Sequence, residues 1–389
     1  MQRQAAPGAW GPDMSEIKGW CPGALRPMQS GDGWVVRVRP RRGRLSREQA
    51  LGLCQAAMTH GAGLVDLTNR ANLQIRGVSD RALAPLQAAL GDLGLLDPDP
   101  EQEARRNILI APDWQDADDT ARLWDALAAR LLDLPALPPK MGFAIDAGLG
   151  PILSRDPADF RIERSADGAL ILRAEGRPFG MALDPGTEID ALLRLAQWFM
   201  DSGGLAARRM VRHHADLPDW GNWSLPPAQA RAPLAAGPAS GGLICGAVFG
   251  QIDARDLGTV LQQSGAAGLR VTPWRLVMLE GVQGEPDMPA TLITTPGHPA
   301  LRIDACAGAP LCPQATVPTR ALARALAGHV TGSLHVSGCA KGCARARPAD
   351  MTLIGRAGAF DLVQGGRATD PPTETGLSPA HILTRFGVV

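Results

Sequence analysis

Two segments of this 389-residue chain follow the same pattern, and this repeat restricts the possible folds more than any other feature. The first copy covers residues 63–68 and 73–78, and the second covers residues 268–272 and 276–282. Thr68 matches Thr272 and Gly77 matches Gly281, with the strand–turn–strand spacing preserved. An internal repeat of this kind predicts a duplicated, pseudo-twofold molecule with a ligand between its halves.

Hydrophobic periodicity around the first copy predicts the order strand, helix, strand, strand, helix. The ranges are 34–39, 46–60, 64–68, 73–78 and 80–93, with Ser46 as the N-cap of the first helix and Gln49 at the capping-box position. A helix near 254–264 precedes the second copy of the strand pair. This order is typical of a ferredoxin-like split βαβ unit, so we expect an α+β fold with duplicated ferredoxin-like units.

An α/β stretch follows each copy. The first copy is followed by predicted strands at 107–111 and 140–146 and predicted helices at 119–134 and 188–201. The second copy is followed by a predicted helix at 319–327 and predicted strands near 333–336 and 351–354. We therefore predict a ferredoxin-like half-domain over 19–95, an α/β domain over 100–225, an Ala/Pro/Gly-rich linker over 226–242, a second half-domain over 243–300, and a cysteine-carrying α/β domain over 301–389.

Composition excludes some classes of function. The 39 Lys and Arg residues balance the 39 Asp and Glu residues, so the chain has no net positive charge to attract nucleic acid. Aromatic residues make up only 4% of the chain and Tyr is absent, so few side chains could stack on bases. Both observations disfavour nucleic-acid binding. No apolar run has the roughly 18 residues of a membrane span, so we expect no membrane association and a cytoplasmic protein. The only lysines are Lys18, Lys140 and Lys341; the arginine excess reflects either a GC-rich genome or a polycarboxylate ligand.

Four cysteines near the end of the chain form two pairs, Cys306-x5-Cys312 and Cys339-x3-Cys343. These gaps are looser than those of structural zinc knuckles and suit the larger body of a [4Fe–4S] cluster. Gly338 and Gly342 directly precede the second pair, so the backbone can approach the cluster. A zinc site and unconnected buried cysteines are the alternatives, and Cys54 and Cys245 are expected in the core.

Polar residues alternate through the first copy, at Arg70, Asn72, Gln74 and Arg76. On a strand these four side chains would share one face, with the apolar residues between them facing the core. Two guanidiniums and two amides in a row suit several carboxylates on a planar ligand. The alternative is a solvated sheet face.

The motif T-x-R-x-N-x-Q-I-R-G, followed by C-x5-C and C-x3-C, resembles the sirohaem-dependent sulfite and nitrite reductases over about residues 20–360. The resemblance implies that the ferredoxin-like and α/β units enclose a tetrapyrrole, and that the last cysteine bridges cluster and haem iron. It also implies that Arg70, Arg106 and Lys140 belong to an anion site. Gly142 and Ala71 stand where the reductases carry polar donors, which weakens the case for reduction of a small oxyanion.

Residues 21–33 and 334–343 resemble the precorrin-3B synthase family of the same superfamily more closely. This resemblance implies an O2-dependent monooxygenase of aerobic cobalamin biosynthesis, which hydroxylates precorrin-3A at C20 with γ-lactone formation. The substrate is a tetrapyrrole with eight carboxylates, so the arginine excess gains a chemical reason. NADH would be the indirect electron source, through a separate electron-donor protein, because no G-x-G-x-x-G follows a strand.

Oxygen activation needs a further group, because a four-thiolate cluster leaves no open iron for O2. A mononuclear non-haem iron is compatible with the resemblance, although no two-His-one-carboxylate motif is visible at short spacing. His335, four residues before Cys339, is either a metal ligand or proton donor, or a buried structural histidine. The alternative functions are a sirohaem-dependent sulfite or nitrite reductase and a non-catalytic tetrapyrrole- or metal-binding protein.

Overall fold

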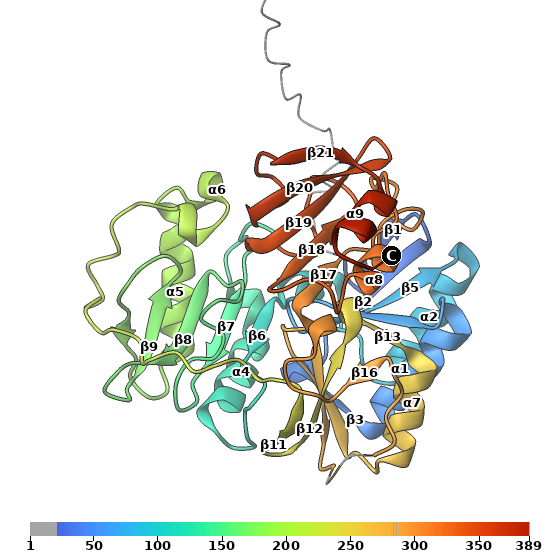
Figure 1. The fold of residues 1–389 in the computed structure, drawn as a ribbon. Helices are drawn as coiled ribbons and strands as arrows, with labels where there is room; N and C mark the ends of the chain where they lie inside the picture. Colours follow the sequence, from blue (N-terminus) through green and yellow to red (C-terminus); the bar gives the residue numbers. More distant parts are fainter. Residues whose placement is uncertain (1–21, 283, 285, 389) are drawn as a thin grey trace, which may run out of the picture. The chain divides into compact units, whose positions relative to one another are not determined.

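The structure is a computed structural model that describes residues 22–282, 284 and 286–388. These residues fall into two compact units, one that ends at Leu301 and one that begins at Arg302, and each is described by itself (Figure 1). No helix in the described ranges is both long enough and apolar enough to cross a membrane.

The first ferredoxin-like half of the larger unit confirms the predicted order of elements. It contains strands β1 (Met28–Ser30), β2 (Gly33–Val38), β4 (Leu64–Leu67) and β5 (Leu73–Val78), with helices α1 (Arg47–His60) and α2 (Asp80–Asp92). The predicted capping box is present at the start of α1: Ser46 Oγ accepts from Gln49 N at 3.1 Å, and Gln49 Oε1 accepts from Ser46 N at 3.0 Å.

The second half repeats this arrangement. Its elements are β11 (Gly237–Ala239), β12 (Gly242–Ala247), α7 (Ala254–Gln263), β14 (Gly268–Val271), β15 (Leu276–Glu280) and β16 (Leu292–Ile293). The turn between the paired strands has the same backbone in both copies, because Ala71 (φ 52°) and Arg275 (φ 62°) both adopt the left-handed conformation three residues after a matched threonine. The duplication predicted from the sequence is therefore visible in the backbone.

The two halves complete each other's sheets. Strand β3 (Arg44–Ser46), which leads into α1, pairs with β14 of the second half, whereas β13 (Gln251–Asp253), which leads into α7, pairs with β4 of the first. The resulting orders are β1-β2-β5-β4-β13 and β11-β12-β15-β14-β3. One short helical turn precedes each exchanged strand, η1 (Arg41–Gly43) and η4 (Val248–Gly250). Each half therefore covers an edge strand of the other.

The predicted linker over 226–242 differs from the structure at its end. Residues Gly237–Ala239 form β11 and pair with β12, which itself begins at Gly242. The Pro/Gly content that indicates a linker is also tolerated in an edge strand, because an edge strand leaves one row of backbone groups unpaired.

The first α/β region also belongs to the larger unit. Its sheet has the order β10-β9-β8-β7-β6, made of β6 (Ile108–Ile110), β7 (Phe143–Asp146), β8 (Phe160–Arg164), β9 (Leu170–Ala174) and β10 (Met181–Ala182). The helices are α3 (Pro100–Arg105), α4 (Asp119–Ala129), α5 (Glu188–Asp201) and α6 (Gly204–Ala207), with short turns η2 (Leu131–Asp133) and η3 (Met210–Arg212). Predicted helix 119–134 is too long, because Arg130 leaves the helical conformation (φ −116°, ψ 21°).

The smaller unit has the same sheet topology. Its order is β17-β18-β19-β20-β21, from β17 (Ile303–Ala305), β18 (Leu334–Ser337), β19 (Ala349–Arg356), β20 (Ala359–Gly366) and β21 (Glu374–Leu377). The first three strands are parallel and the rest antiparallel, as in β6 to β10. Helices α8 (Arg320–Ala325) and α9 (Pro379–Arg385) pack together, and the turn η5 (Pro299–Arg302) precedes β17.

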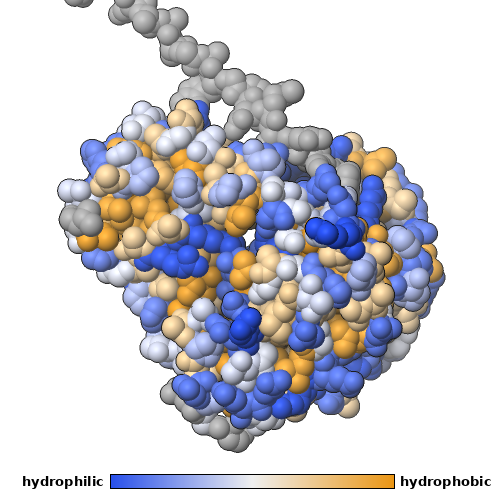
Figure 2. Space-filling model, turned by 90° about the vertical axis from the view of Figure 1, so that its right-hand side faces the viewer, coloured by the Kyte–Doolittle hydropathy of each residue, from blue (hydrophilic) through white to orange (hydrophobic). Residues whose placement is uncertain are grey.

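The exposed surface carries no single dominant patch on the face shown in Figure 2. Hydrophilic residues (blue) are interspersed with hydrophobic ones (orange) over this face. This distribution accords with the balanced formal charge of the sequence.

Candidate functional site

The four clustered cysteines all lie in the smaller unit. Cys306 directly follows β17, and Cys339 lies two residues beyond the end of β18. Since β17 and β18 are parallel neighbours, their C-terminal ends lie at the same edge of the sheet. The topology therefore brings one cysteine of each sequence pair to this edge. Within the described residues, none of the four forms a disulfide bond.

Backbone and hydroxyl contacts hold the two cysteine loops in place. Gly338 N donates to Cys306 Sγ at 3.1 Å, which directly links the loops. Thr319 Oγ1 donates to Cys306 O at 2.6 Å, and Ser337 Oγ donates to Cys339 O at 2.7 Å. An N–H group that points at a cysteine sulfur is one of the features that set the potential of iron–sulfur clusters.

The thiols also interact electrostatically. Burial raises the pKa of Cys343, and the nearby thiols of Cys339, Cys306 and Cys312 raise it further, whereas Lys341 lowers it. Within the described ranges, no group of three or more His, Cys, Asp or Glu side chains converges as a site for one metal ion. The four thiols therefore lie near one another, but the described side chains do not converge on one point as the ligands of a single metal ion do.

Two glycines allow the close packing of these loops. Gly342 has φ +62°, and a Cβ there would come within 2.9 Å of Ala368 Cβ. A Cβ at Gly338 would come within 2.6 Å of Ala315 Cβ. Both glycines are therefore needed for packing within the protein, and their approach to a cluster stays a prediction.

His335 lies beneath the second cysteine loop. It is completely buried in β18, in register with Asp304 of β17 and Thr352 of β19. Its Cε1 atom is 3.6 Å from the position that a Cβ of Gly342 would occupy. This places the imidazole beside the loop that carries Cys339 and Cys343. Cys21, the first residue of the segment 21–33 that resembles the precorrin-3B synthase family, lies outside the described residues, and the sequence assigns it no role.

In the larger unit, the structure brings Arg70 and Lys140 together. Arg70 Nη2 donates to the backbone carbonyl of Lys140 at 2.9 Å, and the Lys140 side chain is exposed. Thr68 Oγ1 accepts from Arg70 N at 3.3 Å and from Asn72 N at 3.1 Å, which orders the turn that carries Arg70.

The prediction that Arg70, Asn72, Gln74 and Arg76 alternate along one strand is wrong for the first two. Strand β5 begins only at Leu73, because the left-handed Ala71 turns the chain before it. Gln74 and Arg76 do lie on β5. Asn72 is buried at the end of the turn.

Gln74 and Arg76 have partners within the protein. Arg76 donates to Asp32 through Nε at 2.9 Å and Nη2 at 2.8 Å, and its Nη1 is 3.5 Å from Asp66 Oδ2. Gln74 Oε1 accepts from Arg37 Nη2 at 2.6 Å. Arg37 was not predicted from the sequence, although it lies between the buried Val36 and Val38 of β2.

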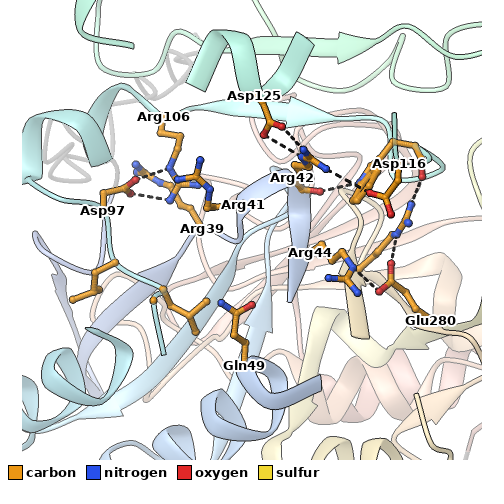
Figure 3. A pocket seen from close by; sticks show the side chains of 15 residues that line it. Arg39, Arg41, Arg42, Arg44, Gln49, Asp97, Arg106, Asp116, Asp125 and Glu280 are labelled. Carbon is orange, nitrogen blue, oxygen red and sulfur yellow. Dashed lines mark hydrogen bonds and ion pairs between the residues drawn. The ribbon is translucent and has the colours of Figure 1, made fainter. Parts of the chain in front are cut away.

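Arg106 lies apart from these residues, in a separate pocket of about 490 Å³ (Figure 3). It is buried and forms a bidentate ion pair with Asp97, with both N–O distances at 2.8 Å. None of the other predicted substrate-binding residues lines this pocket. The lining, called the arginine pocket below, consists of Arg39, Arg41, Arg42, Arg44, Gln49, Gly94, Leu95, Leu96, Asp97, Arg106, Trp114, Asp116, Asp125, Arg270 and Glu280.

Comparison with known proteins agrees with this arrangement. Residues 26–93 match the family model of the nitrite/sulfite reductase ferredoxin-like half domain. A curated precorrin-3B synthase from Sinorhizobium sp. is 30% identical over 419 aligned positions, which cover 95% of this chain and 88% of that protein. The chain belongs to the precorrin-3B synthase family. It is accordingly an enzyme of the oxidoreductase class, as predicted.

A solved structure supports the fold of this precorrin-3B synthase family member. The NirA protein of Mycobacterium tuberculosis matches with a TM-score of 0.60 at 18% identity, covering 86% of this chain and 74% of NirA. The match confirms the predicted α+β architecture of the sulfite/nitrite reductase type.

Proposed function

We propose that this chain catalyses the precorrin-3B synthase reaction of aerobic cobalamin biosynthesis. In this reaction O2 hydroxylates precorrin-3A at C20, and a γ-lactone forms. One oxygen atom enters the substrate, and the other is reduced to water by two electrons and two protons. The observation that carries the proposal is the 30% identity to a precorrin-3B synthase across 95% of the chain.

Cys306, Cys312, Cys339 and Cys343 would hold a [4Fe–4S] cluster. Three observations fit such a group: these cysteines form no disulfide within the described residues, their thiols interact electrostatically, and Gly338 N–H donates to Cys306 Sγ. When bound, the cluster supplies single electrons, which O2 chemistry requires. NADH would be the indirect source of these electrons, through a separate electron-donor protein in the cytoplasm.

The residues proposed to bind the tetrapyrrole differ in accessibility. Arg70 and Lys140 are joined by a hydrogen bond and are best placed to donate to substrate carboxylates, with Asn72 and Gln74 as further polar contacts. Arg76 and Arg106 already hold protein carboxylates, so substrate carboxylates would have to displace or share these partners. His335 would donate a proton, or ligate a mononuclear non-haem iron, near the cysteine loop.

The first test is a joint assay of iron, acid-labile sulfide and extractable tetrapyrrole on protein purified without oxygen. We expect about four iron and four sulfide per chain and no sirohaem. Iron beyond four would support a mononuclear non-haem iron, for which the described side chains offer no ready group of three ligands. Stoichiometric sirohaem would instead identify a sulfite or nitrite reductase and overturn the proposal.

Substitution of a cluster ligand should remove the cluster. In Cys306→Ala we expect iron and sulfide to fall to a small fraction of the wild-type content, because one thiolate ligand is lost. Cys54→Ala is the control: Cys54 is buried in α1, and burial raises its pKa to about 12. Equal metal content in both variants would contradict the assignment of Cys306.

The reaction itself is tested with precorrin-3A, ¹⁸O2 and a chemical reductant. We expect the product mass to increase by one ¹⁸O atom, and Arg70→Gln and Lys140→Gln to raise the KM. Tetrapyrrole binding without any oxygen uptake would favour a non-catalytic protein. Reduction of the cluster by NADH alone at turnover rates would refute the separate electron donor.

A further inference from the structure

The arginine pocket combines six guanidinium groups with four carboxylates. The cations are Arg39, Arg41, Arg42, Arg44, Arg106 and Arg270, and the anions are Asp97, Asp116, Asp125 and Glu280. Its volume of about 490 Å³ lies within the range of roughly 300–1,000 Å³ that small-molecule sites occupy. The lining comes from both ferredoxin-like halves and the first α/β region, all within the larger unit.

Charges on one side of the pocket are balanced. Arg42 forms an ion pair with Asp125 and lies 3.6 Å from Asp116. Glu280 accepts from Arg44 Nε at 2.6 Å and from Arg270 Nε at 2.5 Å. Trp114 packs against this group, with the Arg270 guanidinium carbon 4.0 Å from a ring centroid.

The other side of the pocket has an excess of positive charge. The guanidinium groups of Arg39, Arg41 and Arg106 gather beside the single carboxylate of Asp97 (Figure 3). The contacts of Arg39 include hydrogen bonds to the backbone carbonyls of Glu103 and Pro22. Arg41 is exposed and forms no ion pair with a carboxylate of the described chain; its guanidinium carbon lies 5.7 Å from the Trp124 ring centroid. The lining on this side therefore contributes three guanidiniums and one carboxylate.

The duplication relates this pocket to the face that carries Gln74 and Arg76. Arg270 on β14 occupies the position of Asp66 on β4. Each of the two pairs in register with a residue of the strand that the other half donates: Arg270 with Arg44 of β3, and Asp66 with Gln251 of β13. Glu280 likewise occupies the position of Arg76, so the ion pair Asp66–Arg76 recurs with its charges reversed as Arg270–Glu280. The pocket thus uses the equivalent face of the second sheet.

We propose that the arginine pocket binds aliphatic carboxylate groups, with Arg41 as its accessible donor. Asp97 already occupies the bidentate fork of Arg106, whereas the exposed Arg41 forms no ion pair with a carboxylate of the described chain, so its guanidinium can take a ligand carboxylate. Two sources share this chemistry: the acid arms of a tetrapyrrole, or a free di- or tricarboxylate. The tetrapyrrole source rests on the proposed function, whereas carboxylate binding does not require the oxygenation reaction.

Calorimetric titration with two probes tests the proposal. Uroporphyrin, which carries eight carboxylates, represents the tetrapyrrole source, and citrate represents the free acids. In Arg41→Gln we expect the affinity for the probe that uses the pocket to fall about tenfold or more, because one charge-assisted hydrogen bond is lost. In Arg41→Lys, which restores the charge, we expect this affinity to recover. Arg81→Gln is the matched control, because Arg81 is exposed on α2 and does not line the pocket.

The outcomes separate the sources. Weakening of uroporphyrin binding alone supports the tetrapyrrole arms, and weakening of citrate binding supports a free polycarboxylate. Equal affinity of wild type and Arg41→Gln for both probes overturns the proposal, as does binding of inorganic phosphate as tight as that of citrate. A chain that binds a probe through Arg41 but never consumes oxygen would refute the proposed function and leave the carboxylate site standing.

Discussion

Arg106 and Asp97 show how strongly a buried charge depends on its partner. Both side chains are less than one-tenth exposed, and the pair is bidentate. Removal of one member of such a pair leaves an uncompensated charge in a poorly solvated place. The same reasoning applies to two other side chains that are almost completely buried: Arg161, which pairs with Glu175, and Glu163, which pairs with Arg173.

We therefore expect Asp97→Ala to lower the free energy of unfolding by about 3–5 kcal/mol. The control is Asp133→Ala, which removes the exposed pair with Arg130 and should cost at most about 1 kcal/mol. Urea denaturation of both variants measures the difference. Equal effects would mean that the Arg106–Asp97 pair contributes no more than a surface contact.

Asp146 makes stability depend on pH. Its Oδ2 accepts from Ile152 N at 2.8 Å and Leu153 N at 2.7 Å, whereas its Oδ1 is buried without a hydrogen-bond partner in the described structure. Burial raises the pKa of Asp146 from 3.8 to about 7, and Asp113 and Glu163 add to the effect, against the two N–H bonds.

Because the folded protein binds this proton more tightly than the unfolded chain, the contribution of Asp146 to stability is present at low pH and falls as pH rises from about 4 to about 7. In Asp146→Asn, which cannot ionise, we expect a smaller decrease in the free energy of unfolding between pH 5 and pH 8 than in the wild type. Urea denaturation at both pH values provides the measurement. An unchanged difference would show that Asp146 ionises normally.

At the scale of single elements, α1 and α2 offer a matched comparison of helix caps. Both helices begin after a serine, but only Ser46 accepts a hydrogen bond through its side chain; Ser79 makes no side-chain cap bond. We expect Ser46→Ala to destabilise the protein by about 1 kcal/mol and Ser79→Ala by much less. Thermal melts of the two variants decide this, and equal shifts in Tm would mean that the capping box of α1 adds nothing.

The boundaries of several elements followed from local signals. The capping box marked the start of α1, and the predicted ranges of α5 and β5 agree with the observed ones. Strands β8 and β9 were missed because Arg161, Glu163 and Arg173 interrupt their apolar pattern, and the ion pairs that bury these charges form between the two strands or with a loop.

At the scale of the whole molecule, the exchanged strands couple the two ferredoxin-like halves. Leu45 of β3 is completely buried and pairs in register with Leu269 of β14, although the rest of its half belongs to the other sheet. The first half should therefore not unfold without exposing an edge of the second.

Leu45→Ala should lower the free energy of unfolding by about 2–5 kcal/mol, as for other large-to-small changes in a core. We expect native-state hydrogen exchange to show the same loss of protection in β4 and β5 as in β14 and β15, because the two sheets open together. Loss confined to β14 and β15 would show that the halves unfold independently.

Residue types and spacing along the chain were enough to predict the duplication, the helix caps and the family, because each of these depends on residues within a few positions of one another or on a repeated motif. The partners of Arg76 and Arg106, the exchange of β3 and β13, and the arginine pocket were not predictable in this way. They join residues that are distant in sequence or on different elements, so the ion pairs and the pocket exist only once the sheets have formed. The pairing of Cys306 with Gly338 has the same origin: parallel strands carry both loops to one sheet edge, whereas the sequence shows only two separated pairs of cysteines.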